Sequence, residues 1–384
     1  MRRRDFIKVA ACGTCACTMA GMGLPRAHRK AAAGESNPPR SPQAAPTRSL
    51  REAMYYHKRE HKEIECVLCP RKCVVGDRER GYCGVRENQD GIYYTLVYNQ
   101  ACSCHTDPIE KKPFFHFHPG SLAFSLSTAG CNMNCKYCQN WETSQVRPEQ
   151  VRNFDLTPAD CTARASEDKA LSIAYTYTEP VIFIEYMREI AVAARQSKLK
   201  NLMVSAGFVE QQPLGELLPL LDAVKIDLKS FSDAFYRDVC RGRLEPVLET
   251  LKTIRRQGVW LEIVYLVLPT LNDSPKEIQA LCHWLVSELG PEVPVHFTRF
   301  HPIYLMKNLP PTPVDTLERI RETALAEGLH FPYVGNVPGH PGESTYCPQC
   351  RKRLIQRLGF NLRIEALDKG RCLHCGKAIA GCWA

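Results

Sequence analysis

The stretch LAFSLSTAGCNMNCKYCQNW, residues 122–141, joins a strand pattern to a group of cysteines. Leu122, Phe124 and Leu126 occupy alternate positions, which is typical of a strand. Gly130 and the asparagines after it favour turns. We therefore expect a loop after this strand, rather than a helix that buries its cysteines as an apolar stripe. The loop holds Cys131, Cys135 and Cys138 in a C-x3-C-x2-C array.

The array stops at three cysteines, and the next cysteine in the chain is Cys161. Metal sites built from thiolates usually close with four ligands. Three thiolates on a [4Fe–4S] cluster leave one iron without a protein ligand, and an open coordination position separates a catalytic metal site from a structural one. We therefore predict a catalytic [4Fe–4S] cluster here. Amides that could donate hydrogen bonds to its sulfurs are Asn132, Asn134 and Asn140.

Apolar runs alternate with helical patterns from this loop to about residue 335, which predicts an α/β fold with a parallel sheet. Six strand–helix units would make a partial (β/α)6 barrel rather than a complete eight-stranded one. The expected strands are 122–128, 172–177, 202–205, 223–228, 261–268 and 295–300, and two of the expected helices are 179–197 and 274–289.

Polar residues recur where these strands end, and chemistry in parallel α/β barrels collects at the carboxyl ends of the strands. Besides Cys131, they are Glu179, Ser205, Asp227, Lys229, Asn272, Asp273, Arg299 and His301. Several of them could instead be helix caps or first-turn acids, and Glu179 opens an expected helix.

The C-x3-C-x2-C array, with the aromatic Tyr137 before its last cysteine, resembles the signature of radical S-adenosylmethionine (SAM) enzymes. The resemblance implies that SAM chelates the open iron through its amino and carboxylate groups. It also implies that one electron cleaves SAM to methionine and a 5′-deoxyadenosyl radical, which abstracts hydrogen from a substrate.

A longer resemblance runs from about residue 60 to the end of the chain. YTEP, KIDLKSFSDAFYRDVC, LVLPTLNDS and PGHPGESTYCPQC are similar to segments of the AmmeMemoRadiSam-system radical SAM enzymes, which are relatives of the activating enzymes for pyruvate formate-lyase. The resemblance implies that Glu179 contacts the amino group of SAM and that Asp227 and Lys229 lie beside the cofactor or substrate. Ser205 would lie at the ribose-facing turn, and Arg299 or His301 would approach from the last strand.

The same resemblance implies a low-potential electron donor, and partners of the AMMECR and Memo types. Its activating-enzyme side suggests a protein glycine as the hydrogen donor, and so a glycyl-radical-enzyme activase as an alternative function. A multi-cluster iron–sulfur electron carrier is a further alternative, but it leaves Glu179, Asp227 and Lys229 without roles.

Two other cysteine groups have spacings typical of metal sites, and the chain has 20 cysteines in all. The first is C-x2-C-x3-C-x9-C, which suits zinc or a second iron–sulfur cluster. The second is C-x2-C-x21-C-x2-C, close to a zinc-ribbon spacing. The first group is Cys66, Cys69, Cys73 and Cys83, and the second is Cys347, Cys350, Cys372 and Cys375.

The formal charge of +9 comes almost entirely from residues 1–51, where ten Lys or Arg face two acids. The rest of the chain therefore carries only +1, which argues against nucleic-acid binding. Arg3 and Arg4 before an uncharged run resemble a twin-arginine export signal, and a disordered basic tail is the alternative. The run over 9–24 is too short for a membrane span.

The expected organisation is a twin-arginine-like segment, a Pro- and Ala-rich linker, a Cys-rich region, a radical SAM core and a zinc-ribbon-like tail. Their bounds are 1–24, 25–48, 49–115, 116–340 and 341–384. An export signal and a cofactor supplied in the cytoplasm point to different compartments, so the sequence leaves the location open.

Overall fold

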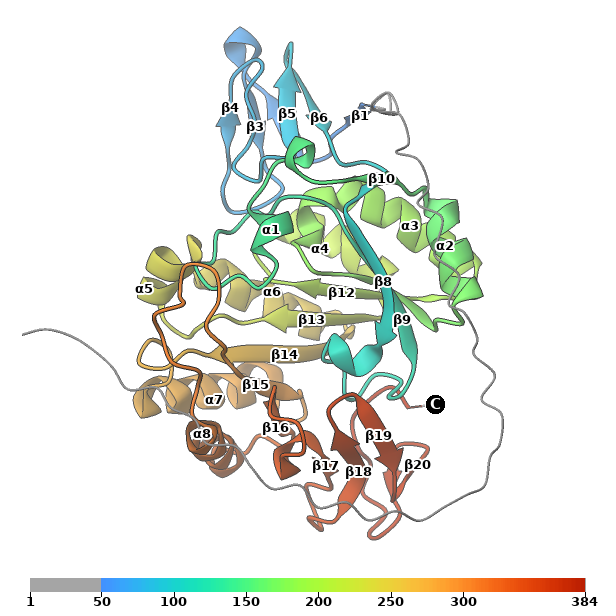
Figure 1. Ribbon diagram of the computed structural model, residues 1–384, viewed down its shortest axis with the longest axis vertical. Coiled ribbons are helices and arrows are strands. Elements are labelled where there is room, and N and C mark those ends of the chain that lie inside the picture. Colours follow the sequence, from blue (N-terminus) through green and yellow to red (C-terminus); the bar gives the residue numbers. More distant parts are fainter. Residues whose placement is uncertain (1–49, 384) are drawn as a thin grey trace, which may run out of the picture. The chain divides into compact units, whose positions relative to one another are not determined.

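One eight-stranded sheet organises residues 50–383, the part of the chain that the computed structural model describes (Figure 1). The predictions made for residues 1–24 and 25–48 lie outside this range. The strand order across the sheet is β16-β15-β14-β13-β12-β11-β9-β8. The strands are β8 (Ser103–Pro108), β9 (Leu122–Ser127), β11 (Ser172–Tyr175), β12 (Lys200–Ser205), β13 (Ala223–Asp227), β14 (Trp260–Val267), β15 (Val295–Arg299) and β16 (Pro332–Gly335).

The strands from β9 to β16 pair in parallel and in chain order, and β8 pairs antiparallel to β9. Because the order never reverses, right-handed crossovers place the connecting helices on one face of the sheet. The arrangement therefore differs from a doubly wound sheet. All six predicted strands are present, and each boundary lies within two residues of its expected position. We expected six parallel strands, but this sheet has one more, β16. The antiparallel strand β8 was not predicted either.

Two of the longer helices, α2 and α7, begin at side-chain caps. Thr157 caps α2, and its hydroxyl accepts from the amide of Asp160, whose carboxylate accepts from the Thr157 amide. Ser274 caps α7, because its hydroxyl accepts from the amide of Glu277, and Asp273 closes the preceding turn by accepting from the Thr270 amide at 2.8 Å. The longer helices are α2 (Pro158–Glu167), α3 (Ile184–Gln196), α4 (Gln211–Leu217), α6 (Glu245–Arg256), α7 (Pro275–Leu289) and α8 (Val314–Ala326). The short ones are α1 (Trp141–Ser144) and α5 (Asp233–Phe235).

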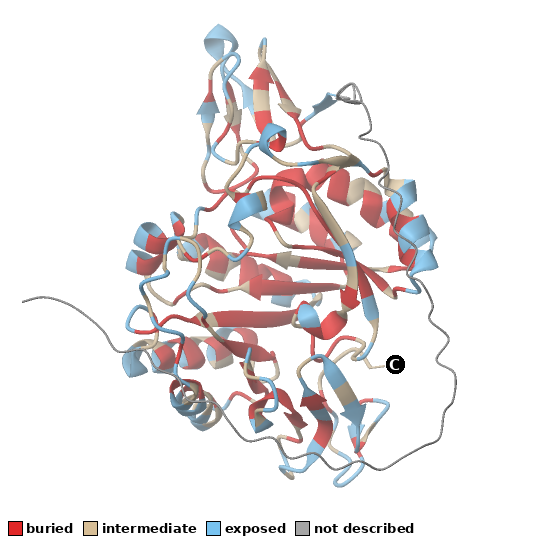
Figure 2. Ribbon diagram, in the orientation of Figure 1, coloured by how far each residue is buried: buried red, intermediate tan, exposed pale blue. Residues whose placement is uncertain are grey.

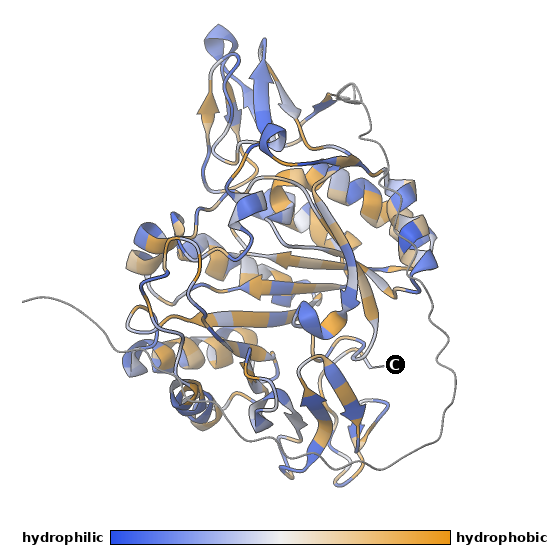
Figure 3. Ribbon diagram, viewed as in Figure 1, coloured by the Kyte–Doolittle hydropathy of each residue, from blue (hydrophilic) through white to orange (hydrophobic). Residues whose placement is uncertain are grey.

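The central strands are covered on both faces, as Figure 2 shows, and they are mostly apolar in Figure 3. All four residues of β11 are buried. Parallel strands with helices on one side and side chains packed on the other need such continuous apolar runs. Lys225 in β13 is an exception, because it is a charged residue only 4% exposed.

The region before the main sheet forms two three-stranded sheets, β1-β6-β5 and β2-β3-β4. A buried ion pair fastens it to α3: Arg86 Nη2 contacts the Glu185 carboxylate oxygens at 2.6 and 2.7 Å. Its strands are β1 (Arg51–Glu52), β2 (Tyr56–Lys58), β3 (Ile64–Cys66), β4 (Val74–Val75), β5 (Arg86–Gln89) and β6 (Ile92–Thr95). Strand β7 (Gln100–Ala101) pairs with β10 (Phe154–Asp155). The last strand of the expected 49–115 region, β8, belongs to the main sheet.

The tail is a small β module that packs against the chain near Phe115 and His116. Arg357 Nη2 donates to the Phe115 carbonyl at 2.8 Å, and the amide of Cys382 donates to the His116 carbonyl at 2.7 Å. The strands of the tail are β17 (Thr345–Tyr346), β18 (Arg353–Leu358), β19 (Asn361–Ile364), β20 (Leu367–Asp368) and β21 (Arg371–Cys372). Within residues 50–383, none of the helices has both the length and the apolar character needed to cross a bilayer.

Candidate active site

The three-cysteine loop leaves the carboxyl end of β9 through a tight glycine. Gly130 has a φ of +91°, and its amide donates to the Thr143 carbonyl at 2.9 Å. A Cβ at this position would lie 2.5 Å from Val85 Cγ1 and 2.6 Å from the carbonyl oxygen of Cys83. Only glycine combines this left-handed backbone with so close an approach to a neighbouring segment. Gly130 therefore fixes where the loop starts and what it packs against.

Residues 128–140 form neither helix nor strand, which confirms the prediction of a loop. The amide of Cys138 donates to the Cys135 carbonyl at 3.1 Å and closes a turn between the last two cysteines. The amide of Asn134 donates to the carbonyl of Cys240 at 3.1 Å, at the end of the π-helical turn η6 (Tyr236–Cys240). Backbone contacts thus hold the loop in place from two sides.

The three thiols are half-buried, and their surroundings change their proton affinity. Burial, followed by the nearby Glu179 carboxylate, raises the pKa of Cys131 well above its usual value. Burial also raises the pKa of Cys138, although the Ser144 hydroxyl, 3.1 Å from its sulfur, opposes the change. A metal must therefore displace protons to bind here, and its positive charge would offset the mutual repulsion of the thiolates.

Glu179 lies at the end of β11, on the same side as the cysteine loop. Its carboxylate is 2% exposed and accepts hydrogen bonds from the Ser205 hydroxyl at 2.6 Å and from the Ala206 amide at 2.8 Å. It also accepts from the Val181 amide, so it caps the short turn that follows. Burial raises the pKa of the Glu179 carboxyl, and the Ser205 hydroxyl opposes that effect. Within residues 50–383 this carboxylate forms no ion pair, so a bound cation would complete its environment.

Asp227, at the end of β13, joins two lysines. Lys229 Nζ lies 3.1 Å from one carboxylate oxygen, and Lys225 Nζ binds the other. Burial acts to raise the pKa of Asp227, but the two ammonium groups outweigh it and lower the pKa to about 2. Burial acts to lower the pKa of Lys229, but Asp227 and Cys135 outweigh it and raise the pKa. The site therefore keeps a fixed positive charge near the Cys135 thiol at neutral pH.

The other residues predicted for the site lie near the same strand ends. Ser205, Arg299 and Tyr137 contact other parts of the protein. The Ser205 hydroxyl is used by Glu179 and by the Gly207 amide. Arg299 Nε donates to the Thr312 carbonyl at 2.8 Å, so this part of its side chain holds a loop. Tyr137 is buried, and its hydroxyl lies 3.5 Å from the Cys240 sulfur. His301 is exposed.

Sequence reasoning missed three residues that the fold brings to this site. Cys240 belongs to none of the cysteine groups in the sequence, but the fold brings it to the three-cysteine loop, where it is the main cause that raises the pKa of the Cys135 thiol. Lys225 is the second partner of Asp227, and Ser144 contacts Cys138. Lys225 could have been found from its place as a charged residue in the middle of an apolar strand pattern. Cys240 lies about 100 residues from the loop and carries no such local signal.

The side chains fit the groups that the cysteine pattern predicts. Three thiols from one turn-rich loop provide the donors of an iron–sulfur cluster. The buried Glu179 carboxylate, with no cation of its own among the described residues, suits an ammonium group. Asn132 Oδ1 is a buried oxygen without a hydrogen-bond partner in residues 50–383, so it can accept from a bound molecule.

The cysteines Cys66, Cys69, Cys73 and Cys83 also gather in space. Cys66 ends β3 and faces Cys73 across a hairpin, where the Cys66 amide donates to the Cys73 carbonyl at 2.9 Å. Burial raises the pKa of Cys69 to about 12, and the negative charges of the other three thiolates add to the effect. A bound cation would favour the ionised form of these thiols and offset the repulsion between the thiolates.

The tail cysteines form a tighter group. All four sulfurs lie within 4.8 Å of one another, with Cys347 and Cys375 at 3.6 Å and Cys350 and Cys372 at 3.7 Å. A tetrahedral zinc site with Zn–S bonds of about 2.3 Å has S–S edges of about 3.8 Å. The tail therefore has the dimensions of a site for one metal ion.

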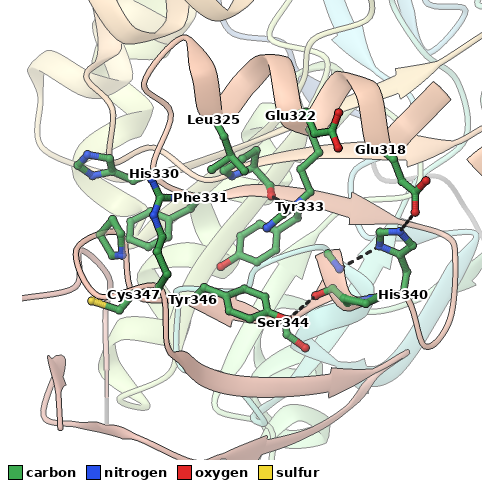
Figure 4. Close-up of a pocket in the computed structure, with 16 residues that line it drawn as sticks. Glu318, Glu322, Leu325, His330, Phe331, Tyr333, His340, Ser344, Tyr346 and Cys347 are labelled. Carbon is green, nitrogen blue, oxygen red and sulfur yellow. Dashed lines mark hydrogen bonds and ion pairs between the residues drawn. The ribbon is translucent and has the colours of Figure 1, made fainter. Parts of the chain in front are cut away.

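A pocket of about 540 Å³ lies elsewhere, between α8, β16 and the start of the tail (Figure 4). Glu318 and His340 contact each other at 3.1 Å on its wall, and Tyr333 and Tyr346 also line it. It contains none of the residues of the three-cysteine site, so we do not assign it to the same chemistry.

Comparison with known proteins shows which family the chain belongs to. The family model of the radical SAM superfamily matches residues 125–284, which include all three cysteines, Glu179 and Lys229. The uncharacterized protein MJ0808 of Methanocaldococcus jannaschii is 44% identical over 332 residues, which cover 86% of this chain and 99% of that protein. The chain therefore belongs to one family with MJ0808, and it carries a radical SAM domain.

More distant similarity extends to activating enzymes. The pyruvate formate-lyase 1-activating enzyme of Escherichia coli K12 is 22% identical over 218 residues, which cover 53% of this chain and 88% of that enzyme. The crystal structure of a domain of pyruvate-formate lyase-activating enzyme from Bacteroides vulgatus has 15% identity and a TM-score of 0.39, over 43% of this chain and 99% of that domain. The radical SAM domain implies a [4Fe–4S] cluster and SAM as cofactors, and it supports the interpretation of the chain as an enzyme.

Proposed function

We propose that the chain cleaves SAM reductively at the Cys131–Cys135–Cys138 site and uses the resulting radical to abstract hydrogen from a protein substrate. The observation that supports this most strongly is the buried Glu179 carboxylate, which lies near Cys131 and has no cationic partner in residues 50–383. An electron carrier would need the three thiolates but would have no use for this carboxylate.

The chain's own residues would bind and orient the cofactor. When bound, a [4Fe–4S] cluster supplies one electron that splits SAM into methionine and a 5′-deoxyadenosyl radical. Glu179 would hold the SAM ammonium group, because Ser205 and Ala206 already orient its carboxylate. Lys229 contributes positive charge near Cys135, and Asp227 keeps that lysine in place. Because the pKa of Asp227 is about 2, this residue orients charge and does not transfer protons at neutral pH.

The rim of the site supports a macromolecular substrate. The rings of Trp141 and Tyr304 stack with their centres 5.1 Å apart, and Trp141 is 37% exposed. The amide of Leu305 donates to the Lys136 carbonyl at 3.0 Å, so this pair lies against the cysteine loop. Exposed aromatic residues at a rim are typical of surfaces that bind other proteins. A glycine of a partner protein is the donor we favour, as the resemblance to activating enzymes described above suggests, and AMMECR-type and Memo-type proteins are the partners to test.

The test measures 5′-deoxyadenosine after anaerobic reconstitution with iron and sulfide and reduction in the presence of SAM. We expect wild type to release it and Cys135→Ala to release none. Cys282→Ala is the matched control, because Cys282 is a buried thiol on α7 and belongs to none of the three cysteine groups. Release by Cys135→Ala at the wild-type rate would contradict the assignment.

The substrate is tested separately with candidate partners produced with Cα-deuterated glycine. Transfer of deuterium into 5′-deoxyadenosine, found by mass spectrometry, identifies a glycine donor. Loss of this transfer in Trp141→Ala, with uncoupled SAM cleavage retained, would assign Trp141 to substrate docking. If the 5′-deoxyadenosine contains no deuterium with any partner, the glycine proposal is wrong. The proposal that the chain cleaves SAM would not be affected.

We also propose that zinc occupies the tail site, because the S–S distances of 3.6 and 3.7 Å match the edges of a zinc–thiolate tetrahedron. The tail contacts the segment Phe115–His116 rather than the three-cysteine loop, so its metal would be structural.

A further inference from the structure

The cysteines Cys66, Cys69, Cys73 and Cys83 are held in one place by the backbone. Cys66 and Cys73 face each other across the β3–β4 hairpin, and Cys69 lies in the turn that connects them, where the Lys72 amide donates to the Cys69 carbonyl at 3.1 Å. Cys83 lies in a second turn, closed by the Gly84 amide on the Gly81 carbonyl at 2.9 Å. Two turns and a hairpin thus present four thiols to one point.

Hydrogen bonds and packing join the second turn to the hairpin. The amide of Tyr82 donates to the Cys73 sulfur at 3.5 Å. A Cβ on Gly81 would lie 3.9 Å from the same sulfur and 2.4 Å from the Tyr93 hydroxyl, so only glycine fits beside the thiols. Amide donors to thiolate sulfur are a feature of bound metal centres, because they stabilise the charge on the sulfur.

The spacing of these thiols differs from that of the tail site. Among Cys, His, Asp and Glu of residues 50–383, the tail is the one group of three or more whose ligand atoms all lie within 4.8 Å of one another. No three of the sulfurs of Cys66, Cys69, Cys73 and Cys83 therefore all lie within 4.8 Å of one another, whereas the edges of a zinc–thiolate tetrahedron are about 3.8 Å. A four-iron cube needs a wider spacing, because each thiolate binds a different iron. The sulfurs of Cys131, Cys135 and Cys138 likewise do not all lie within 4.8 Å of one another.

We propose that Cys66, Cys69, Cys73 and Cys83 bind a second, fully protein-ligated [4Fe–4S] cluster. The site lies next to the catalytic loop, because the Cys83 carbonyl and Val85 pack against Gly130. Arg71, between Cys69 and Cys73, reinforces this contact, because its Nε donates to the Asn132 carbonyl at 3.0 Å. The two centres are thus parts of one packed unit.

The test uses the full chain with Cys131, Cys135 and Cys138 all changed to alanine, so that the catalytic site cannot contribute. After anaerobic reconstitution we expect this variant to retain about four iron and four sulfide per chain, together with about one zinc in the tail. Mössbauer spectra and the EPR signal after reduction should show a [4Fe–4S] cluster. Wild type should bind about eight iron per chain.

A second substitution assigns the remaining iron to its ligands. Adding Cys69→Ala and Cys83→Ser together to the triple variant should remove that cluster, because only two of its four thiols remain, whereas adding Cys161→Ala, a buried thiol on α2, should leave it unchanged. A triple variant that folds with no iron and about two zinc per chain would overturn the proposal. Iron that persists after Cys69→Ala and Cys83→Ser would also overturn it. Because the triple variant cannot cleave SAM, neither result depends on the proposed function.

Discussion

Glu179 and Ser205 meet between the ends of two neighbouring parallel strands, where the Ser205 hydroxyl donates to the Glu179 carboxylate at 2.6 Å. The Ala206 amide adds a second bond at 2.8 Å. Strand β11 therefore supplies the charge, and strand β12 fixes its orientation. A carboxylate that is oriented before its ligand arrives loses little entropy on binding.

Glu179→Gln should weaken SAM binding by roughly 10- to 100-fold, the cost of losing one charge-assisted hydrogen bond. Equilibrium binding to the reconstituted protein measures the effect, with iron content as the test of an intact cluster. Ser205→Ala is the matched control: it keeps the charge and removes one donor, so we expect a loss of roughly 2- to 10-fold.

The same carboxylate predicts a pH effect. Burial raises the pKa of Glu179, so its charged form is lost at a higher pH than for an exposed glutamate. SAM affinity should therefore fall on acidification in wild type and become less pH-dependent in Glu179→Gln. Equal pH profiles in the two proteins would contradict the assigned role.

Lys229→Met should make the catalytic cluster harder to reduce. The ammonium acts on Cys135, and removing a positive charge near a cluster shifts its reduction potential to more negative values. An EPR-monitored redox titration should show this shift, together with slower release of 5′-deoxyadenosine and unchanged iron content. Lys252→Met, which removes a lysine paired with Glu249 on α6, is the control. An unchanged potential in Lys229→Met would rule out this electrostatic role.

The ion pair of Arg86 with Glu185 should dominate the attachment of the first small sheets to α3. Arg86→Met leaves Glu185 buried without its cation, which should lower the free energy of unfolding by about 3–5 kcal/mol. Urea unfolding measures this change. The double variant Arg86→Met, Glu185→Leu should lose less than the single one, because no unpaired charge remains.

An exposed ion pair provides the comparison. Arg353 and Glu365 contact each other at 2.8 and 3.0 Å in the tail, where water screens them. Arg353→Met should therefore cost much less stability than Arg86→Met. Similar losses in Arg86→Met and Arg353→Met would show that burial of the first pair has no energetic consequence.

The parts of the fold that sequence could predict have local signals. Strands such as β11 and β14 are apolar runs bounded by turn residues, and the cysteine loop has its own glycine and asparagines. Strand β8 was missed because its sequence, SCHTDP, is polar and lies at the edge of the sheet. Strand β16 has only four residues and two of them, Pro332 and Gly335, oppose strand formation.

The candidate site likewise has parts that the sequence predicts and parts that it does not. Its cysteines and Glu179 follow predicted strands and Asp227 lies near the end of one, so the topology alone brings them to one edge. The hydrogen bond from the Asn134 amide to the Cys240 carbonyl joins segments over 100 residues apart, and so, elsewhere in the fold, do the bonds from the Phe115 and His116 amides to the Glu262 carboxylate. No local pattern encodes such contacts, because they depend on how strands and tail pack together.

His116 should make the stability of the protein depend on pH. Its ring is buried beside Glu262, His296 and Arg357, and its nitrogens contact the Ala380 carbonyl and the Tyr333 hydroxyl. Burial, which Glu262 partly opposes, lowers the pKa of His116 to about 4 from an ordinary value of 6.5. The unfolded chain therefore binds a proton at this residue between about pH 6.5 and pH 4, whereas the folded protein does not.

The stabilising contribution of neutral His116 is thus complete above pH 6.5 and is lost as the pH falls through 4. In that window it should change the free energy of unfolding by up to about 1.4 kcal/mol per pH unit. His296, whose pKa burial also lowers, should add in the same direction. Urea unfolding of wild type from pH 7.5 to 4.5 should show this slope, and His116→Asn should show a smaller one whatever its absolute stability. His283→Asn, at an exposed position on α7, should keep the wild-type slope, and equal slopes in wild type and His116→Asn would refute the assignment.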